Sequence, residues 1–394
     1  MALLIVIARL RALDPWSPAG GQHVSIILPL TGEAASFGVL LDALNKQTLV
    51  PDCLLVAVES EQDPAYARVQ SLMHKATFPI KLVVAGLATH QAQKCRNQQA
   101  ALDHLSPDTQ IIVLMDGDIV PGPLWLGRLV WPVASGKYDI NSAHRWQQVA
   151  KPGFGAHLIA MIDRSVTLLP RVELDSACVT WGGSIAMPAQ VAQFMDLRGL
   201  LGRVLSDDLA LAARASTLGL RVGTHRSLLV ASPNDQSFLS AWRFARRQYQ
   251  MCRIYRPQLW LMGLGIIGLR LIGWGAAIWI ALTQHTGVWA VVAVLMLLGV
   301  LKQQVTSRLS ACLGLPDEHR VRRVQWALGA LQPIVDLFHL SVILGACCSR
   351  TIRWGHVTYR VSGPQSIQVQ ARDGAVCAAG QASKKKCDPL RTGR

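Results

Sequence analysis

Two aspartates separated by a single glycine end a short apolar run in this sequence. Asp116 and Asp118 close the stretch IIVLMDGD. Side chains two positions apart in an extended segment point the same way, and two such carboxylates can hold a hard divalent cation together with substrate phosphates. A solvated turn without a ligand is the alternative, because Asp-Gly-Asp is ordinary turn chemistry. We expect Gly117 to permit the turn or close strand packing, since a side chain there would point away from the two carboxylates.

A second acidic pair begins an expected helix. Asp207 and Asp208 follow Ser206, a residue type that often caps helices, and an apolar stripe follows them. Acidic residues in the first turn of a helix usually interact only with the helix dipole. A carboxylate fixed there and ionised at neutral pH could also be the general base for a sugar hydroxyl. The residues alone leave both interpretations open.

Both pairs lie where short β-branched runs alternate with amphipathic stretches. Between residue 22 and about residue 250, runs such as HVSIILPL, DCLLVAVES and IIVLMD are separated by stretches such as EAASFGVLLDALNKQ. This alternation is typical of βαβ units and predicts an α/β fold with a largely parallel sheet covered on both faces. Ligands of such sheets bind outside the carboxyl ends of the strands, where Asp116 and Asp118 would lie.

The chain as a whole is basic and hydrophobic. Its formal net charge is +15 and 51% of its 394 residues are hydrophobic. The charge would suit either nucleic acid or an anionic membrane surface, and the hydropathy favours the membrane, so no nucleic-acid partner is expected. Nine cysteines without metal-ligand spacing and the lack of an evident signal peptide indicate reduced thiols and a cytoplasmic catalytic face.

Three apolar segments follow the alternating region, at residues 259–282, 287–301 and 326–348. The first is long enough to cross a hydrocarbon core, which needs about 20 residues. It contains Arg270, and an arginine at the centre of a span costs ~2.5–3.5 kcal/mol, so we expect it to pair with Asp336 unless the segment is tilted and Arg270 reaches an interface. Three spans, or two spans and a re-entrant segment, both remain possible; only the second keeps the basic tail inside.

The predicted organisation has four parts. They are an N-terminal segment (1–21), an α/β domain (22–257), a membrane region (258–348) and a C-terminal tail (349–394). From about residue 363 the tail is polar and ends in ASKKKCDPLRTGR, so we expect it to be partly disordered.

Eight motifs resemble, in order, those of the ceramide glucosyltransferase-like branch of family 2 glycosyltransferases, which includes the hopanoid-associated bacterial enzymes. They are VSIILPLTG, ESEQDPA, KCRNQQAAL, LMDGDIVP, CVTWGGSIAMP, LSDDLALAARASTLGLRV, FARRQYQMCRIYRP and TIRWGHVTYRV, and they span roughly residues 22–362. The resemblance implies a GT-A fold, a Rossmann-like nucleotide-sugar-binding domain followed by transmembrane helices. It also implies a UDP-sugar donor, Mg²⁺ or Mn²⁺, and inversion at the anomeric carbon.

The resemblance implies roles for the acidic residues. Asp63 in QDPA matches an aspartate that contacts the nucleotide. Asp116 and Asp118 match the motif that meets the diphosphate and the metal. Asp208 matches the catalytic base, with Asp207 beside it.

Three further positions match residues around the donor and the acceptor. Lys94 corresponds to a basic residue on the donor side, and Gly182 and Gly183 correspond to a small-residue turn on the acceptor side. Each has a simpler explanation. Lys94 could be a solvated helix lysine, and the glycines could serve only a tight turn.

The membrane-proximal motif departs from the family pattern of Gln or Arg, two residues, then Arg-Trp. The best superposition places Arg247 first, Gln250 in place of the second arginine and Met251 in place of tryptophan. A second register uses Gln250 and Arg253 and also lacks the tryptophan. Arg247 and Gln250 are candidates for donor binding, since a guanidinium can grip phosphate oxygens. The basic residues could instead attract anionic lipid at about 1 kcal/mol per charge.

Together these features predict a multi-pass membrane enzyme with a cytoplasmic catalytic domain. It would be an inverting glycosyltransferase that moves a hexose from a UDP-sugar to the hydroxyl of a membrane lipid such as ceramide, diacylglycerol or a hopanoid-like acceptor. A processive polysaccharide synthase is one alternative, although it would normally keep the motif that is degraded here. A catalytically decayed membrane adaptor is the other.

Overall fold

The computed structural model describes residues 21–151, 153–167, 180–283 and 287–373. A seven-stranded sheet in the order β3-β2-β1-β4-β6-β5-β7 forms its centre. The strands are β1 (Val24–Pro29), β2 (Cys53–Val58), β3 (Ile80–Val84), β4 (Ile111–Met115), β5 (Ile140–Val149), β6 (Ser184–Pro188) and β7 (Val222–Asn234). β1 to β4 pair in parallel, β5 is parallel to β7, and only β6 runs antiparallel to its neighbours β4 and β5. The predicted α/β fold with a largely parallel sheet is confirmed.

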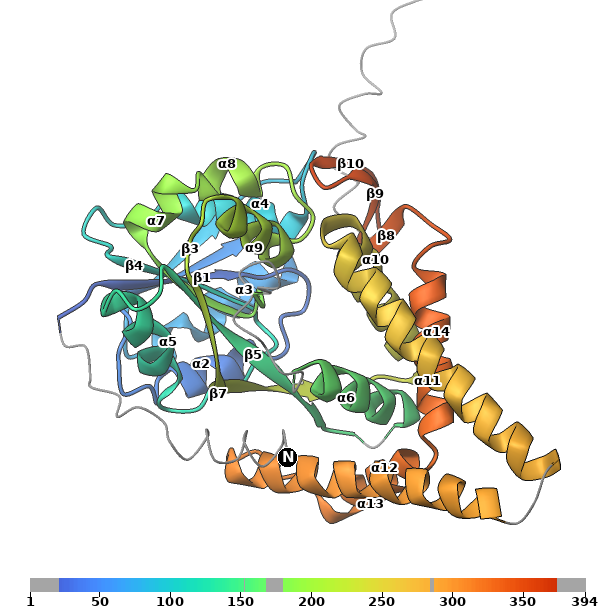
Figure 1. The fold of residues 1–394 in the computed structure, drawn as a ribbon. Coiled ribbons are helices and arrows are strands. Elements are labelled where there is room, and N and C mark those ends of the chain that lie inside the picture. The colour runs from blue at the N-terminus through green and yellow to red at the C-terminus, as the bar shows by residue number, and fades with distance from the viewer. Residues whose placement is uncertain (1–20, 152, 168–179, 284–286, 374–394) are drawn as a thin grey trace, which may run out of the picture.

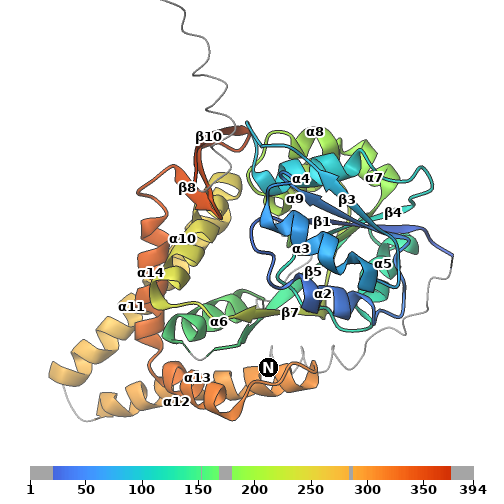
Figure 2. The same ribbon diagram turned by 180° about the vertical axis from the view of Figure 1, so that it is seen from behind.

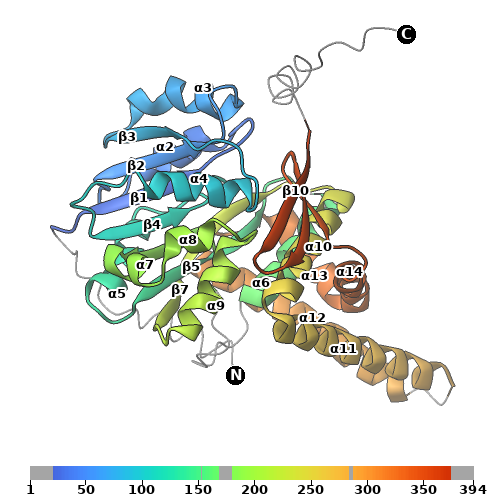
Figure 3. The same ribbon diagram turned by 90° about the horizontal axis from the view of Figure 1, so that it is seen from above.

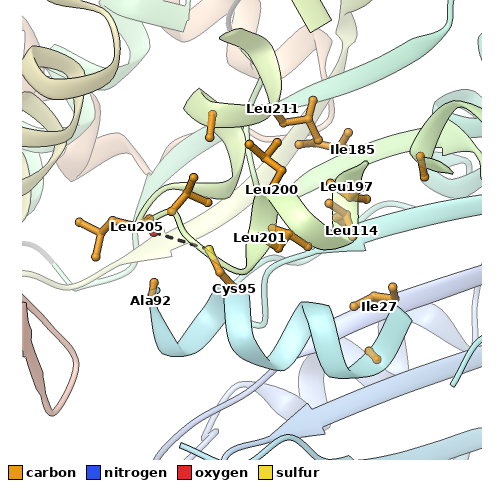
Figure 4. Packing of buried hydrophobic residues seen from close by; sticks show 14 of the residues in the cluster. Ile27, Ala92, Cys95, Leu114, Ile185, Leu197, Leu200, Leu201, Leu205 and Leu211 are labelled. Atoms are coloured by element: carbon orange, nitrogen blue, oxygen red, sulfur yellow. Dashed lines mark hydrogen bonds between the residues drawn. The ribbon is translucent and has the colours of Figure 1, made fainter. Parts of the chain in front are cut away.

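Helices cover both faces of this sheet (Figure 1), and a hydrophobic core lies under each layer. One layer contains α4 (Gln93–Leu102), α7 (Ala189–Phe194), α8 (Leu197–Leu201) and α9 (Asp207–Thr217), and the other contains α2 (Phe37–Leu44), α3 (Pro64–Leu72) and α5 (Trp125–Ala134); a 3₁₀ turn, η1 (Met73–Lys75), follows α3. Strand residues contribute alternately to the two cores because their side chains alternate between faces. Ile27 of β1 packs under α4 and α8 (Figure 4), whereas Ile26 and Leu28 pack on the opposite face.

A second sheet lies at the end of the described chain. The strands β8 (Thr351–Trp354), β9 (Val357–Gly363) and β10 (Ser366–Arg372) are antiparallel and lie beside α10 (Phe238–Tyr255), as Figure 3 shows. The Tyr359 hydroxyl accepts a hydrogen bond of 2.9 Å from the backbone N–H of Gln93, and Nε2 of His356 lies 3.0 Å from the Glu59 carboxylate. The expected disorder from about residue 363 is therefore wrong for residues 366–372. Alternate side chains of this polar segment pack on the core that lies under α4, α7, α8 and α9. Residues 374–394 lie outside the described chain.

The helical region consists of α11 (Pro257–Thr283), α12 (Gly287–Cys312), α13 (His319–Ala330) and α14 (Gln332–Gly345), all seen from behind in Figure 2. α11 and α12 are long and apolar enough to cross a membrane, and α12 extends well beyond the predicted end at residue 301. α13 and α14 meet at an angle of 84°, so the third predicted segment is broken. Arg270 lies 3.0 Å from the carboxylate of Asp336, which confirms their predicted pairing.

A buried arginine attaches this helical region to the large sheet. Arg164 of α6 (Phe154–Thr167) binds both carboxylate oxygens of Asp317, at 2.6 and 2.7 Å, and donates to the backbone carbonyl of Gln147 in β5. Its guanidinium lies 4.8 Å from the centre of the Trp146 ring, and the Trp146 indole donates to Ser310 of α12. The segment between α12 and α13 is thus bound to β5 through Arg164, and α12 contacts β5 directly through Ser310.

Candidate active site

The Asp-Gly-Asp segment directly follows β4 at the carboxyl end of the sheet. Oδ1 of Asp116 lies 2.6 Å from Nζ of Lys94 in α4, and the Asp118 side chain is exposed without an ion-pair partner among the described residues. A Cβ atom at Gly117 would lie 2.5 Å from Cδ2 of Leu30. The prediction that Gly117 permits close packing is confirmed. The two aspartates differ, because Asp116 is paired with Lys94 and Asp118 is not paired with any described residue.

Lys94 joins the two acidic pairs. Its Nζ lies 2.9 Å from Oδ2 of Asp207, and the same oxygen accepts a hydrogen bond of 2.8 Å from Gln98. The lysine side chain is only 14% exposed, so it is not a solvated helix lysine. Burial opposes the charge on Lys94, but the surrounding carboxylates, Asp116 foremost, raise its pKa well above the ordinary lysine value. Burial raises the pKa of Asp116 to about 6 against the opposing charge of Lys94. One lysine therefore balances carboxylates from two segments.

Asp208 is the more accessible member of the second pair. Its Oδ1 accepts hydrogen bonds from the Leu209 N–H at 2.7 Å and from the Ser206 hydroxyl, and its Oδ2 accepts one from the Gly182 N–H at 3.2 Å. Asp207 is only 2% exposed, whereas Asp208 is partly exposed. Burial raises the pKa of Asp208 above the ordinary aspartate value. The start of α9 thus buries the Asp207 carboxylate and leaves the Asp208 carboxylate partly accessible at the surface.

The two glycines lie between the acidic pairs. A Cβ atom at Gly182 would lie 2.8 Å from Nζ of Lys94, and one at Gly183 would lie 2.2 Å from the ring of Trp181. The carbonyl of Gly183 accepts a hydrogen bond of 3.3 Å from the Asp116 N–H. Side chains at these positions would displace the lysine and the tryptophan, so the glycines serve the close approach of β6 to both acidic segments.

Asp63 lies at the same edge of the sheet, just after β2. It caps α3, and its Oδ1 accepts hydrogen bonds from the N–H groups of Ala65 at 2.9 Å and Gly32 at 2.8 Å. The residue is 3% exposed, and Oδ2 has no partner among the described residues. Burial raises the pKa of Asp63. The cap explains the position of Asp63, and its contact with a nucleotide stays a prediction.

A cavity opens beside the Asp-Gly-Asp segment. Its lining is mostly polar and comes from the Asp-Gly-Asp segment, β5, the segment before β6, the end of β7 and the residues after it, and α10. The lining residues are Asp116, Asp118, Arg145, Gln147, Trp181, Ser232, Pro233, Gln236 and Phe244. The sequence reasoning missed Arg145, Gln147 and Gln236. No strand was predicted there, and the available signal was only that Arg145 and Gln147 are two positions apart and would share a face if the segment were extended.

The two candidates from the membrane-proximal motif differ in their surroundings. Gln250 is buried, and its side-chain nitrogen donates to the backbone carbonyls of Ser349 at 3.1 Å and Thr351 at 3.3 Å, so its amide already serves to hold the start of β8. Arg247 lies one turn of α10 beyond Phe244. Burial and the nearby Arg145 lower the pKa of Arg247 to about 10.

Comparison with known proteins identifies relatives in both sequence family and fold. A family model described as glycosyl transferase family 21 matches residues 1–367. A mannosyltransferase from Pyrobaculum calidifontis, solved with GDP-Man and Mn²⁺, superposes with a TM-score of 0.50 at 16% identity over 88% of this chain and 95% of that one. Glucosyl-3-phosphoglycerate synthase from Mycobacterium tuberculosis gives a TM-score of 0.38 at 19% identity over 57% of this chain and 78% of that one. None of the curated proteins matches the chain in sequence. The family match and the superposition on the mannosyltransferase show that the fold is GT-A.

Proposed function

Since this chain belongs to glycosyl transferase family 21, we propose that it is an inverting, membrane-bound enzyme that moves a hexose from a UDP-sugar to the hydroxyl of a membrane lipid. The family and the GT-A fold make it a nucleotide-sugar glycosyltransferase. The sequence motifs resembled a branch of glycosyltransferase family 2, whereas the family model that matches the chain is that of family 21. One observation carries the finer proposal. The exposed carboxylate of Asp118 lines a polar cavity whose wall, α10, continues into apolar α11. The partly exposed Asp208 is hydrogen-bonded to the N–H of Gly182, the residue after the cavity-lining Trp181.

The donor side suits a metal that is shared with the substrate. Among the described residues, no group of three or more His, Cys, Asp or Glu could hold a metal ion. Asp118, with Asp116 behind it, supplies one or two oxygen ligands, which fits Mg²⁺ or Mn²⁺ bound through few carboxylates and the phosphates of the nucleotide. When bound, the metal would neutralise charge on the diphosphate. Asp63, at the same edge, would contact the nucleotide.

Asp208 would be the general base. Its ionised carboxylate takes the proton of the acceptor hydroxyl while that oxygen forms a bond to the anomeric carbon and the bond to the diphosphate breaks. A single displacement of this kind inverts the configuration. Lys94 and Asp207 would hold the base and the Asp116 segment in register through their buried ion pairs, with Gly182 and Gly183 allowing the close approach.

The acceptor would reach Asp208 from the membrane. α10 lines the cavity with Phe244 and ends at Tyr255, and α11 begins at Pro257 and is long enough to span a bilayer. A soluble acceptor would need no such helix next to the site, whereas a lipid headgroup must be met at the interface. Gln147 and Gln236 offer amide groups to headgroup hydroxyls. Ceramide, diacylglycerol and hopanoid-like lipids all satisfy this requirement.

The position of the C-terminal sheet restricts the membrane topology. The helical region leaves the α/β domain at α10 and returns to it at β8, so a chain that spans the membrane would cross it an even number of times in between. α11 and α12 would be the two crossings, and the bent pair of α13 and α14 would stay on the domain side. The basic residues of α10 would keep that side cytoplasmic.

A transfer assay tests this function. Full-length protein in detergent is given Mn²⁺ or Mg²⁺, a total lipid extract and radiolabelled UDP-glucose, UDP-galactose, UDP-N-acetylglucosamine or GDP-mannose. We expect label in a lipid-soluble product from one UDP-sugar, and none from the matched variant Asp208→Asn. An insoluble polymer would identify a polysaccharide synthase, product from GDP-mannose alone would contradict the UDP assignment, and no product from any donor would favour the decayed adaptor.

A further inference from the structure

Four side chains from β5, α10 and β8 stack in a row from the cavity to the C-terminal sheet. The Arg145 guanidinium lies 5.1 Å from the centre of the Phe244 ring, and the Arg247 guanidinium lies 5.4 Å from the same ring. Arg247 lies a further 5.4 Å from the centre of the Trp354 ring. Arg145 and Phe244 line the cavity next to Asp118. We call this row of Arg145, Phe244, Arg247 and Trp354 the stacked row.

The two arginines of the stacked row are not equally neutralised. Nη2 of Arg145 lies 2.6 Å from the Asp163 carboxylate, and its Nε donates to the same oxygen at 2.8 Å. Nε of Arg247 is buried and has no acceptor among the described residues. A buried cation is costly unless it is paired, and each aromatic face returns only about 0.5–2 kcal/mol. The Arg247 guanidinium thus lies close to two aromatic rings and has no ion-pair partner among the described residues.

The charges that act on Arg247 indicate what would complete the site. Arg145 repels its charge and Asp118 attracts it. An anion bound at Asp118 through a metal would lie in the same cavity as Phe244, one helical turn from Arg247. Guanidinium groups bind phosphate oxygens strongly because both partners are charged and one guanidinium can donate two parallel hydrogen bonds to the phosphate.

We propose that Trp354, together with Phe244, positions Arg247 to bind a phosphate of the donor diphosphate. This inference rests on the function proposed above and names a residue that its site requires. It also accounts for the missing tryptophan of the membrane-proximal motif. Met251 is 5% exposed and packs in the core of the α/β domain, so the ring beside Arg247 comes from β8 instead.

Hydrogen bonds from α10 hold the start of β8, and they therefore fix the position of Trp354 relative to Arg247 on the same helix α10. The two hydrogen bonds from Gln250 hold the carbonyls of Ser349 and Thr351, and Ile352 is buried in the core. Gln250, predicted to bind the donor, would therefore act on it indirectly by holding the strand that carries Trp354.

Nucleotide binding to the full-length protein in detergent with Mn²⁺ tests the inference, with UDP and UMP as probes in calorimetric titrations. We expect Trp354→Leu to weaken UDP binding by about 2- to 30-fold, which is the loss of one cation–aromatic contact, and to leave UMP binding unchanged. Trp354→Phe should bind UDP nearly as the natural protein does. Arg247→Gln should weaken UDP binding by about 10- to 150-fold, the value of a charged hydrogen bond.

Trp242 offers a matched control on the same helix. Its ring lies 5.5 Å from the Arg246 guanidinium, outside the stacked row, so Trp242→Leu should leave the UDP-to-UMP affinity ratio unchanged. The inference is overturned if Trp354→Leu weakens UDP and UMP equally, weakens neither, or raises only the KM for the lipid acceptor. In those cases sugar transfer by the natural protein would still support the proposed function. If the natural protein binds no UDP, both proposals fail.

Discussion

Replacing each of the two adjacent aspartates by asparagine should separate the chemistry of the site from its support. In Asp208→Asn, the amide oxygen can still accept from Leu209 and Ser206, and only the hydrogen bond from Gly182 is lost. That bond to a charged group contributes about 1.5–3 kcal/mol, and removing the charge also relieves repulsion by Asp207. We therefore expect little change in the free energy of unfolding. Turnover should fall by about 10²- to 10⁴-fold, because an amide cannot take the acceptor's proton.

Asp207→Asn should show the opposite pattern. Asp207 is 2% exposed and pairs with Lys94 at 2.9 Å. Removing one member of a buried ion pair costs about 3–5 kcal/mol, and Asp116, at 2.6 Å from the same lysine, should reduce the loss to the lower part of that range. The variant should unfold more easily and bind the donor less well, because Asp116 shifts with Lys94, yet its remaining folded protein should transfer sugar.

Two measurements on both variants distinguish these outcomes. Intrinsic fluorescence during heating in detergent gives the unfolding midpoint, and initial rates at varied donor concentration give kcat and KM. A raised donor KM with a lowered midpoint is expected for Asp207→Asn, and a lowered kcat at unchanged KM and midpoint for Asp208→Asn. Full turnover by Asp208→Asn, together with a folded but inactive Asp207→Asn, would refute the assignment of the base.

Four further results are expected. Asp118→Ala should abolish donor turnover at an unchanged unfolding midpoint, since the side chain is exposed; full activity of this variant, or of the natural protein with a chelator, would remove the metal from the reaction. Turnover should decline with acid at a pH above the ordinary aspartate pKa of 3.8, because burial raises the pKa of Asp208 and the protonated acid cannot act as base; a pH–rate profile that is flat down to that value would contradict this. Arg164→Met should lower the free energy of unfolding by about 3–5 kcal/mol in chemical denaturation, and Arg164→Met with Asp317→Leu should recover most of the loss, because the single change leaves a buried carboxylate unpaired; equal losses would exclude the pair as a stabilising contact. Deleting residues 351–372 should leave an α/β domain that exposes part of its core and aggregates on size-exclusion chromatography; a monodisperse domain with the unfolding midpoint of the whole protein would show that the second sheet is dispensable.

The sequence predicted those parts of the fold that are encoded by residues close together in the chain. The alternation of apolar runs was enough for the parallel strands and for the place of Asp116 at their carboxyl ends, because strand period and connection length are encoded nearby in sequence. The pairing of Arg270 with Asp336 was also accessible, since the cost of an unpaired charge in a span leaves few partners. The antiparallel direction of β6 depends on tertiary packing and was not predicted. For the third apolar segment, the sequence left a full span and a re-entrant segment open, and the break between α13 and α14 also depends on packing.

The candidate site was predicted less completely, for a physical reason. Asp208 and Lys94 were identified by resemblance, but the structure was needed to show that Lys94 joins both acidic segments. Arg145, Gln147 and Trp354 were not predicted, since their importance comes from contacts between residues far apart in the chain. The polar composition after residue 363 was misleading, because an edge strand with one buried face reads as mostly polar.

The C-terminal sheet has a consequence for how the protein is made. Chains generally fold from the N-terminus as they leave the ribosome. Here the hydrogen bond from Gln93 to Tyr359 and the ion pair of Glu59 with His356 join the first third of the chain to its last described strands. The α/β domain must therefore wait, with part of its core exposed, until α11 to α14 and the C-terminal sheet have been synthesised. If α11 and α12 span a membrane as proposed, a chain whose helices do not enter the bilayer would not bring β8 back to the site, and catalytic competence would be acquired only by protein that has reached a membrane.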